Sequence, residues 1–193
     1  MSLKLIMACD RAGFVATDTL QLPWHLKADL QHFKSKTTAQ TVIMGHSTLK
    51  TLPNPWNTTG LPHRQNIVVS TQYTGPLKTL RSLEELLDLC QQNPMTPYWL
   101  IGGANLATQV LTLSPAILSD IWLTVVQGPT QTAGPQIALP PYSPGLPQPP
   151  VPANDQPFWT VKGYSHNPAA VGGPNDQAFS IVHWARRPNA TPF

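Results

Sequence analysis

The sequence predicts an α/β protein with a mostly parallel central sheet, an antiparallel strand near its C-terminus and helices on both faces. Up to about residue 126, short apolar runs alternate with stretches of helical periodicity, as in parallel strands joined by crossovers. Two later strand-like runs have no helix between them, which favours antiparallel pairing. The 193 residues suit one domain, 1–193, with a Pro-rich loop insertion at about 129–157 that holds ten of the 22 prolines.

Three strands are expected in the first half of the chain. Leu3–Cys9 is apolar and too short for a typical helix, Thr41–Gly45 is β-branched and closed by glycine, and Asn66–Ser70 is the third. Helical periodicity follows the first two strands, over Leu26–Lys36 and His46–Leu52. Each of these elements is short enough for a compact α/β domain.

Two loops separate these elements. Asp10–Gln21 lacks a sustained period and contains Gly13. Pro53–Pro62 holds three prolines and a glycine, which predicts a surface loop.

The second half of the chain begins with a capping box, Ser82-Leu-Glu-Glu85, which predicts the start of a helix. The strand expected at Tyr98–Ile101 ends at Gly102-Gly103, and a helix follows through Leu111. The remaining expected strands are Asp120–Val126, Phe158–Tyr164 and Phe179–Trp184.

Composition narrows the possible function. Charged residues make up only 11% of the chain, so the surface must rely on Gln, Asn, Thr, Ser and Pro. The net charge is +3, and the positive residues form no stripe suited to nucleic acid. The charge therefore supports only a mild preference for anionic small molecules.

The apolar segments predict a soluble, cytoplasmic protein without membrane contacts. The first apolar run is too short for a signal peptide, and no segment approaches the roughly 20 residues of a membrane helix. Cys9 and Cys90 form no disulfide framework, and Cys9 is expected to be buried. The six histidines show no metal-ligand spacing, so no metal site is expected.

Asp29 lies in an unusual position. On a helix it shares one stripe with Leu26, Leu30 and Phe33, where a buried unpaired charge would cost several kcal/mol or become neutral. A ligand that supplies the missing partner would explain it. A half-solvated or capping position at the helix margin would explain it too.

Two strands run through glycine into a helix, at Gly45 and at Gly102-Gly103. A helix N-terminus with a nearby glycine can accept an anion, although either junction alone is explained by a tight turn. Ser70 and Thr71 end a strand where a phosphate could lie, or they simply cap it. Arg64 could clamp a carboxylate through two hydrogen bonds, or it could be an exposed loop residue with no binding role.

These blocks, in this order, resemble the dihydrofolate reductase family across nearly the whole chain. The matching motifs are Leu22-Pro-Trp-His-Leu with Asp29-Leu-x-x-Phe33, Val42-Ile-Met-Gly45 with Thr48, Leu61-Pro-x-Arg64-x-Asn66, Leu100-Ile-Gly-Gly103 and Leu123-Thr124. The resemblance implies the family's fold, a mostly parallel sheet with an antiparallel C-terminal strand, flanked by helices. It also implies NADPH-dependent reduction of 7,8-dihydrofolate to tetrahydrofolate by hydride transfer to C6 with N5 protonation.

The resemblance also implies the site. Asp29 would hold the pterin through N3 and the 2-amino group, joined by Thr124 through its hydroxyl and by Trp24 through an ordered water. Arg64 would clamp the glutamate tail. The apolar substrate walls would be Ala8, Leu30, Phe33, Leu52 and Leu61. The residues implied to bind NADPH are Ala8, Val15, Gly45, His46, Ser47, Thr48, Ser70, Thr71, Ile101, Gly102, Gly103, Ala104 and Gln109, with Ser70 and Thr71 at the 2′-phosphate. A cis peptide is implied at Gly102-Gly103. The implied partners are dihydrofolate and antifolates, bound by a monomer.

Four residues depart from the family pattern. Ala16 replaces a glycine of the mobile loop, and His46 replaces an arginine at the 2′-phosphate. Ala107 replaces a tyrosine beside the nicotinamide pocket, and Pro135 aligns with an aspartate that latches the mobile loop. These changes predict altered kinetics or inhibitor response rather than lost chemistry.

Two other functions stay open. A reductase of the same fold could act on another pterin or a pyrimidine, although Arg64 argues for a substrate with a carboxylate tail. A catalytically silent relative could bind folate, or a partner through the Pro-rich loop. The departures near the cofactor favour that silent relative, whereas Asp29, Thr124 and Gly102-Gly103 count against it.

Overall fold

The computed structural model describes residues 3–129, 133–137, 159–168 and 177–187. Most of the expected Pro-rich insertion, over 138–158, lies outside these ranges. In chain order the elements are β1 (Leu3–Asp10), α1 (Lys27–Thr37), β2 (Thr41–Gly45), α2 (His46–Thr51), α3 (Trp56–Thr59), β3 (Gln65–Val69), β4 (Lys78–Leu80), α4 (Leu83–Gln92), β5 (Tyr98–Leu100), α5 (Ala104–Leu113), the 3₁₀ turn η1 (Pro115–Ile117), β6 (Leu118–Val126), β7 (Trp159–Asn167) and β8 (Phe179–Arg186).

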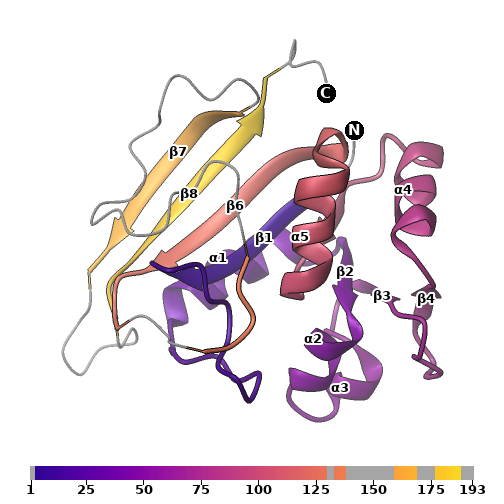
Figure 1. Ribbon diagram of the computed structural model, residues 1–193, viewed down its shortest axis with the longest axis horizontal. Helices are drawn as coiled ribbons and strands as arrows, with labels where there is room; N and C mark the ends of the chain where they lie inside the picture. The colour runs from indigo at the N-terminus through magenta and orange to yellow at the C-terminus, as the bar shows by residue number, and fades with distance from the viewer. Residues whose placement is uncertain (1–2, 130–132, 138–158, 169–176, 188–193) are drawn as a thin grey trace.

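The described strands form one sheet in the order β4-β3-β2-β5-β1-β6-β8-β7 (Figure 1). The strands from β4 to β6 pair in parallel. β8 pairs antiparallel with both β6 and β7, so β8 alone among the described strands runs against the others. The predicted fold class is therefore confirmed, including its antiparallel C-terminal strand.

Helices cover both faces of the sheet, because alternate residues of the strands are apolar on each side. On one face, α4 and α5 pack through residues such as Leu86 and Val110 against Leu5 and Ile121. On the other face, the hydrophobic clusters join Phe33 of α1 to neighbouring strands. Figure 1 shows α5 in front of the sheet and α1 behind it.

Two local predictions need correction. The loop expected over Pro53–Pro62 contains the short helix α3, where the amides of Thr58 and Thr59 both donate to the Pro55 carbonyl at 3.0 Å. Proline is tolerated there because the amides of a first helical turn need no partner within the helix. The strand β4 was not expected, since three residues are too short to show a period.

The capping box is present in a modified form. The Ser82 hydroxyl accepts from the Glu85 amide at 3.3 Å, as predicted. The Glu85 carboxylate accepts from the amide of Arg81 rather than from that of Ser82. The helix start is therefore fixed by side-chain bonds at two amides.

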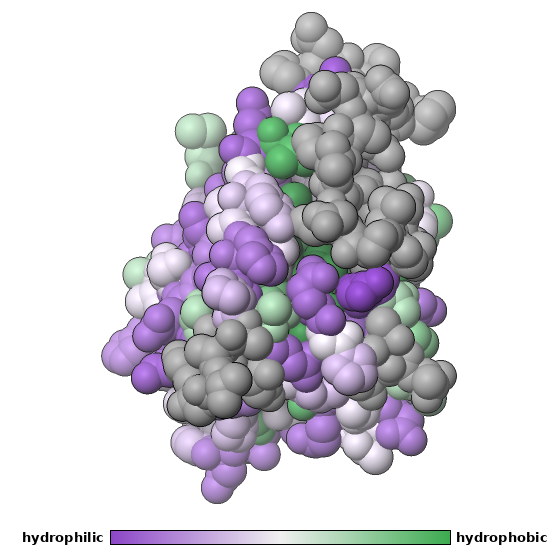
Figure 2. All heavy atoms as spheres, turned by 90° about the vertical axis from the view of Figure 1, so that its left-hand side faces the viewer, coloured by the Kyte–Doolittle hydropathy of each residue, from purple (hydrophilic) through white to green (hydrophobic). Residues whose placement is uncertain are grey.

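The surface and the cysteines agree with the composition. On the side where β7 forms the sheet edge, Figure 2 shows a mostly hydrophilic described surface with small, separate hydrophobic patches. Cys9 and Cys90 are buried and neither is in a disulfide, and burial raises the pKa of the Cys9 thiol. Within the described ranges, no helix combines the length and apolar character needed to cross a bilayer.

Candidate active site

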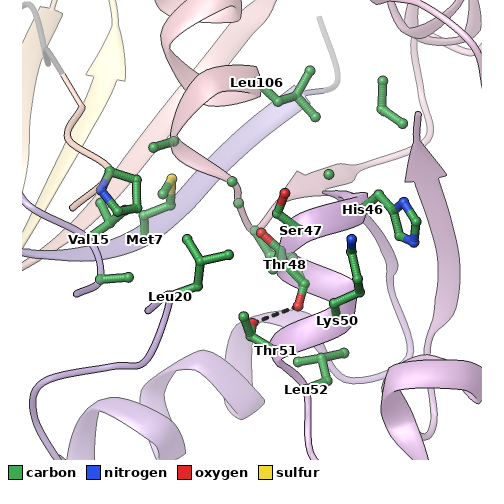
Figure 3. Close-up of a pocket in the computed structure, with 18 of the residues that line it drawn as sticks. Met7, Val15, Leu20, His46, Ser47, Thr48, Lys50, Thr51, Leu52 and Leu106 are labelled. Atoms are coloured by element: carbon green, nitrogen blue, oxygen red, sulfur yellow. Dashed lines mark hydrogen bonds between the residues drawn. The ribbon is translucent and has the colours of Figure 1, made fainter. Parts of the chain in front are cut away.

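A cavity of about 1380 Å³ opens at the carboxyl ends of the parallel strands. Its walls come from β1, β6, α1, α2, α5 and the loop that follows β1. Open α/β sheets bind ligands at this edge, where helix N-termini and loops converge. Figure 3 shows Leu20 between Met7 and Val15 on one side and Thr48 and Leu52 on the other.

The half-buried carboxylate of Asp29 is the main polar group at this site. Asp29 lies in the first turn of α1, and the Thr124 hydroxyl, on a residue only 3% exposed, donates to Asp29 Oδ1 at 2.5 Å. Burial raises the pKa of Asp29, and the Thr124 hydrogen bond opposes that rise. The carboxylate therefore faces the cavity from a partly desolvated position, where a ligand with N–H donors would stabilise its charge.

Apolar side chains surround this carboxylate. Leu30 is 42% exposed, because the α1 stripe faces the cavity rather than a core. Trp24 is buried against Leu26 and Phe179, which fixes the wall beside Asp29. The combination suits a flat, mostly apolar ring with a polar edge.

Arg64 is held at another part of the cavity wall by contacts with α1 and its own loop. Its Nε donates to Thr37 Oγ1 at 2.9 Å, and its Nη1 donates to the Pro62 carbonyl at 2.6 Å. The guanidinium lies 5.6 Å from the centre of the Phe33 ring, and burial lowers the pKa of Arg64. A cation fixed in this way suits a ligand carboxylate.

The glycines after β5 bring backbone close to α2. The Gly102 carbonyl accepts from the Gly45 amide at 2.9 Å, and the Gly102-Gly103 peptide is cis, as the resemblance implied. A Cβ at Gly102 would lie 2.9 Å from Thr48 Oγ1. No side chain caps the amides that begin α5. The junction therefore presents backbone amides and a hydroxyl to the cavity.

Polar residues line the cavity around the strand end at Ser70. The Ser70 hydroxyl accepts from the amides of Gln72 and Tyr73, both at 3.1 Å. Arg81 Nη1 donates to the carbonyls of Ser70, Thr71 and Tyr73. The His46 ring lies edge-on to Tyr73, with 5.2 Å between centroids. This turn is therefore fixed by an arginine that the sequence analysis did not single out.

The loop after β1 is tied to the segment 133–137. The Val15 amide donates to the Pro135 carbonyl at 3.0 Å, and the Ile137 amide donates to the Gly13 carbonyl at 3.0 Å. Backbone bonds thus link the two segments next to Pro135, and the side-chain amide of Gln136 adds a hydrogen bond to the Ala12 carbonyl. Ala107, the fourth departure from the family pattern, is fully buried in the core.

All the site residues named from the sequence line this one cavity. They are Ala8, Val15, Trp24, Asp29, Leu30, Phe33, Gly45, His46, Ser47, Thr48, Leu52, Leu61, Arg64, Ser70, Thr71, Ile101, Gly102, Gly103, Ala104, Gln109 and Thr124. The structure brings them together, while the ligand group that each contacts stays a prediction.

Further lining residues were not expected as site residues. They are Met7, Leu20, Leu22, Lys34, Lys50, Thr51, Trp56, Arg81, Asn105 and Leu106. Lys50 follows His46 by four positions on α2, so helical spacing could have indicated a shared face. Leu20 could not be found this way, because its loop lacks a period.

The fold and the cavity together define an α/β protein with a cavity of ligand size at the carboxyl edge of its sheet. A family model for dihydrofolate reductase matches residues 2–142. The dihydrofolate reductase of Bacillus subtilis is 33% identical over 111 residues, which span 56% of this chain and 61% of that protein. The Staphylococcus aureus (strain Mu50) enzyme is 27% identical over 128 residues, which span 66% of this chain and 73% of that protein.

A solved structure shares the fold. Dihydrofolate reductase from Enterococcus faecalis, complexed with NADP(H) and RAB-propyl, matches with a TM-score of 0.71 and 22% identity, over 96% of each chain. The alignment with the Bacillus subtilis relative covers less than two thirds of that relative's length. The family match, however, covers well over half of this chain, and the chain therefore belongs to the dihydrofolate reductase family.

Proposed function

We propose that the protein reduces 7,8-dihydrofolate to 5,6,7,8-tetrahydrofolate with NADPH, by hydride transfer to C6 and protonation at N5. The Asp29–Thr124 pair in the large cavity is the observation that carries the proposal. The named relatives are dihydrofolate reductases, and the similar solved structure is a complex with NADP(H). Antifolates are expected to occupy the same cavity.

Asp29 is proposed to bind the pterin edge. Its carboxylate would accept hydrogen bonds from N3 and the 2-amino group. The hydroxyl of Thr124 would orient the carboxylate through its hydrogen bond to Oδ1. These ligand donors would replace the water that burial removes, which favours the ionised carboxylate. Trp24 would line the same pocket through an ordered water.

The proton at N5 is proposed to come from water. The negative charge of Asp29, in a cavity of low polarity, favours the protonated form of N5. Asp29 would therefore act by its field and by positioning the ring. It would not need to transfer the proton itself.

The rest of the substrate would follow the cavity wall. The pterin and benzoyl rings would contact Leu30, Phe33, Leu52 and Leu61, and Arg64 would bind the carboxylate of the glutamate tail. A substrate without a carboxylate would leave Arg64 unused. For this reason we propose a folate as the substrate, rather than another pterin or a pyrimidine.

The residues at the Gly102 junction fit a dinucleotide. Thr48 and the uncapped amides of α5 would hold phosphate oxygens, close to the glycines that leave room for them. Ser70 and Thr71 would lie at the 2′-phosphate. When bound, NADPH would supply the hydride. Because His46 replaces an arginine at this end, the preference for NADPH over NADH is to be measured, as the ratio of turnover with the two cofactors.

The test is steady-state oxidation of NADPH with dihydrofolate, for the wild type and Asp29→Asn. Loss of the carboxylate is expected to lower turnover by about 10²-fold or more near neutral pH. Asp88→Asn, on an exposed residue of α4, is the matched control and should keep full activity. A wild type that binds folate without turnover would instead identify a silent binding protein.

We also propose one domain over 1–193, acting as a cytoplasmic monomer. β7 and β8 extend the same sheet that contains β1, which supports a single domain. The cytoplasmic location rests on the sequence alone. Light scattering after gel filtration would test the monomer.

A further inference from the structure

Arg64 is held by a residue that lies behind the cavity wall. Thr37, the last residue of α1, is 0% exposed, and its hydroxyl oxygen accepts from Arg64 Nε at 2.9 Å. We propose that Thr37 is a positioning residue, which aims Arg64 and thereby sets the preference for ligands with a carboxylate tail. This inference rests on the proposed function.

The hydroxyl of Thr37 has a fixed direction. Its proton is donated to the Phe33 carbonyl at 2.7 Å, one turn back along α1. The oxygen must therefore use a lone pair toward Arg64, and it cannot rotate without losing the bond to Phe33. Thr37 thus offers the guanidinium one defined acceptor, anchored to the helix backbone.

The three printed contacts of the guanidinium leave a definite set of donors. Of the five N–H groups of Arg64, one on Nε donates to Thr37, one on Nη1 to the Pro62 carbonyl at 2.6 Å, and one on Nη2 to Thr38 Oγ1 at 3.5 Å. Among the residues that the structure describes, this leaves one N–H on each terminal nitrogen. Two such donors match the two oxygens of a carboxylate.

The Nε contact decides the angle of this pair of donors. The bond to Thr38 is at the limit of a hydrogen bond, so it constrains the plane weakly. The bond to the Pro62 carbonyl fixes the position of Nη1, but the guanidinium plane could still rotate about that bond. Thr37, close and buried, removes that rotation. Without it, Arg64 would keep its charge but lose its orientation.

The variants isolate the hydroxyl of Thr37. Thr37→Val keeps the branched shape and removes the oxygen, and Thr37→Ser keeps the oxygen. Ser35→Ala is the matched control, because the exposed Ser35 hydroxyl also donates to a carbonyl of α1, that of His32 at 2.7 Å. Each variant is assayed with dihydrofolate and with a dihydropterin that lacks the glutamate tail.

A selective loss is expected. Thr37→Val should raise the KM for dihydrofolate roughly tenfold, with kcat within about twofold and the KM for the tail-less pterin unchanged. Thr37→Ser should restore most of the KM, and Ser35→Ala should change it less than about twofold. In an Arg64→Leu background, Thr37→Val should add no further loss, because both changes remove the same interaction.

Other results would contradict the proposed role of Thr37. Equal KM increases for both substrates, or an additive loss in the Arg64→Leu background, would show that Thr37 merely supports the fold. If the wild type turns over and Thr37→Val has the same KM for dihydrofolate, this inference is overturned while the proposed function stands. Absence of wild-type turnover would overturn the proposed function and this inference with it.

Discussion

The Thr124 hydroxyl donates a 2.5 Å hydrogen bond to the Asp29 carboxylate, joining β6 to α1 across 95 sequence positions. Burial raises the pKa of Asp29, while this bond acts in the opposite direction. The Thr124 hydroxyl therefore counteracts part of the effect of burial on the ionisation of Asp29. Changes at either residue should be visible in the pH dependence of stability and of activity.

Asp29→Asn is expected to stabilise the fold at neutral pH. Because the folded-state pKa is raised above the unfolded value, the protonated carboxyl stabilises the fold at acid pH, and this stability is lost as the pH rises through the folded pKa. The amide carries no charge to bury. Thermal unfolding across this range should show a melting-temperature gain that grows with pH to a few degrees. A difference independent of pH would contradict the burial of charge at Asp29.

Thr124→Val is expected to raise the pKa of Asp29 further, since it removes the hydrogen bond that lowers it. The acid limb of the kcat/KM profile should then move to higher pH. A hydrogen bond to a charged group contributes about 1.5–3 kcal/mol, so kcat/KM at neutral pH should fall roughly tenfold or more. Thr124→Ser keeps the hydroxyl and should retain the wild-type limb. An unshifted limb in both variants would show that the bond does not govern the ionisation.

Gly102→Ala is expected to destabilise the protein and to weaken cofactor binding. Gly102 has φ +143°, which side chains rarely adopt, and a Cβ would lie 2.9 Å from Thr48 Oγ1. Such backbone strain costs about 1–3 kcal/mol. Gly163→Ala on β7 is the control, because its Cβ would meet nothing closer than 3.9 Å. Urea unfolding and NADPH titration should separate the two variants, and equal values would refute the close contact.

Asp120→Asn is expected to destabilise the sheet between β6 and β8. Burial alone would raise the pKa of Asp120, but hydrogen bonds from His183 at 2.7 Å and Ser119 at 2.8 Å, with the charge of Lys4, lower it overall. A lowered folded pKa gives stability that is present at neutral pH and lost as the pH falls through it. The free energy of unfolding should drop by about 1.5–3 kcal/mol at pH 7 and by less in acid. Asp88→Asn should show no such dependence.

The sequence predicted the described strands other than β4, and the longer helices, because each shows an apolar run, a helical period or a capping box. It also marked Asp29, since a carboxylate in an apolar stripe is locally anomalous. Its partner Thr124 could be placed only through the family resemblance, because the contact depends on β6 lying beside β1.

Other features have no local pattern that could reveal them. Arg81 acts through three backbone carbonyls, which no side-chain spacing encodes. Leu20 adopts φ 63° in a turn where its amide donates to Thr17, and an apolar side chain gives no hint of that conformation. Thr37 reads as an ordinary helix end until Arg64 is placed beside it.

The position of β1 in the middle of the sheet has a consequence for synthesis. β1 leaves the ribosome well before its neighbours β5 and β6, which end only at Leu100 and Val126. At about 5–20 residues per second, the apolar β1 waits several seconds without a partner strand. Nascent chains that stop before Thr124 should therefore be the species most in need of chaperones, and they cannot yet form the pair between Asp29 and Thr124.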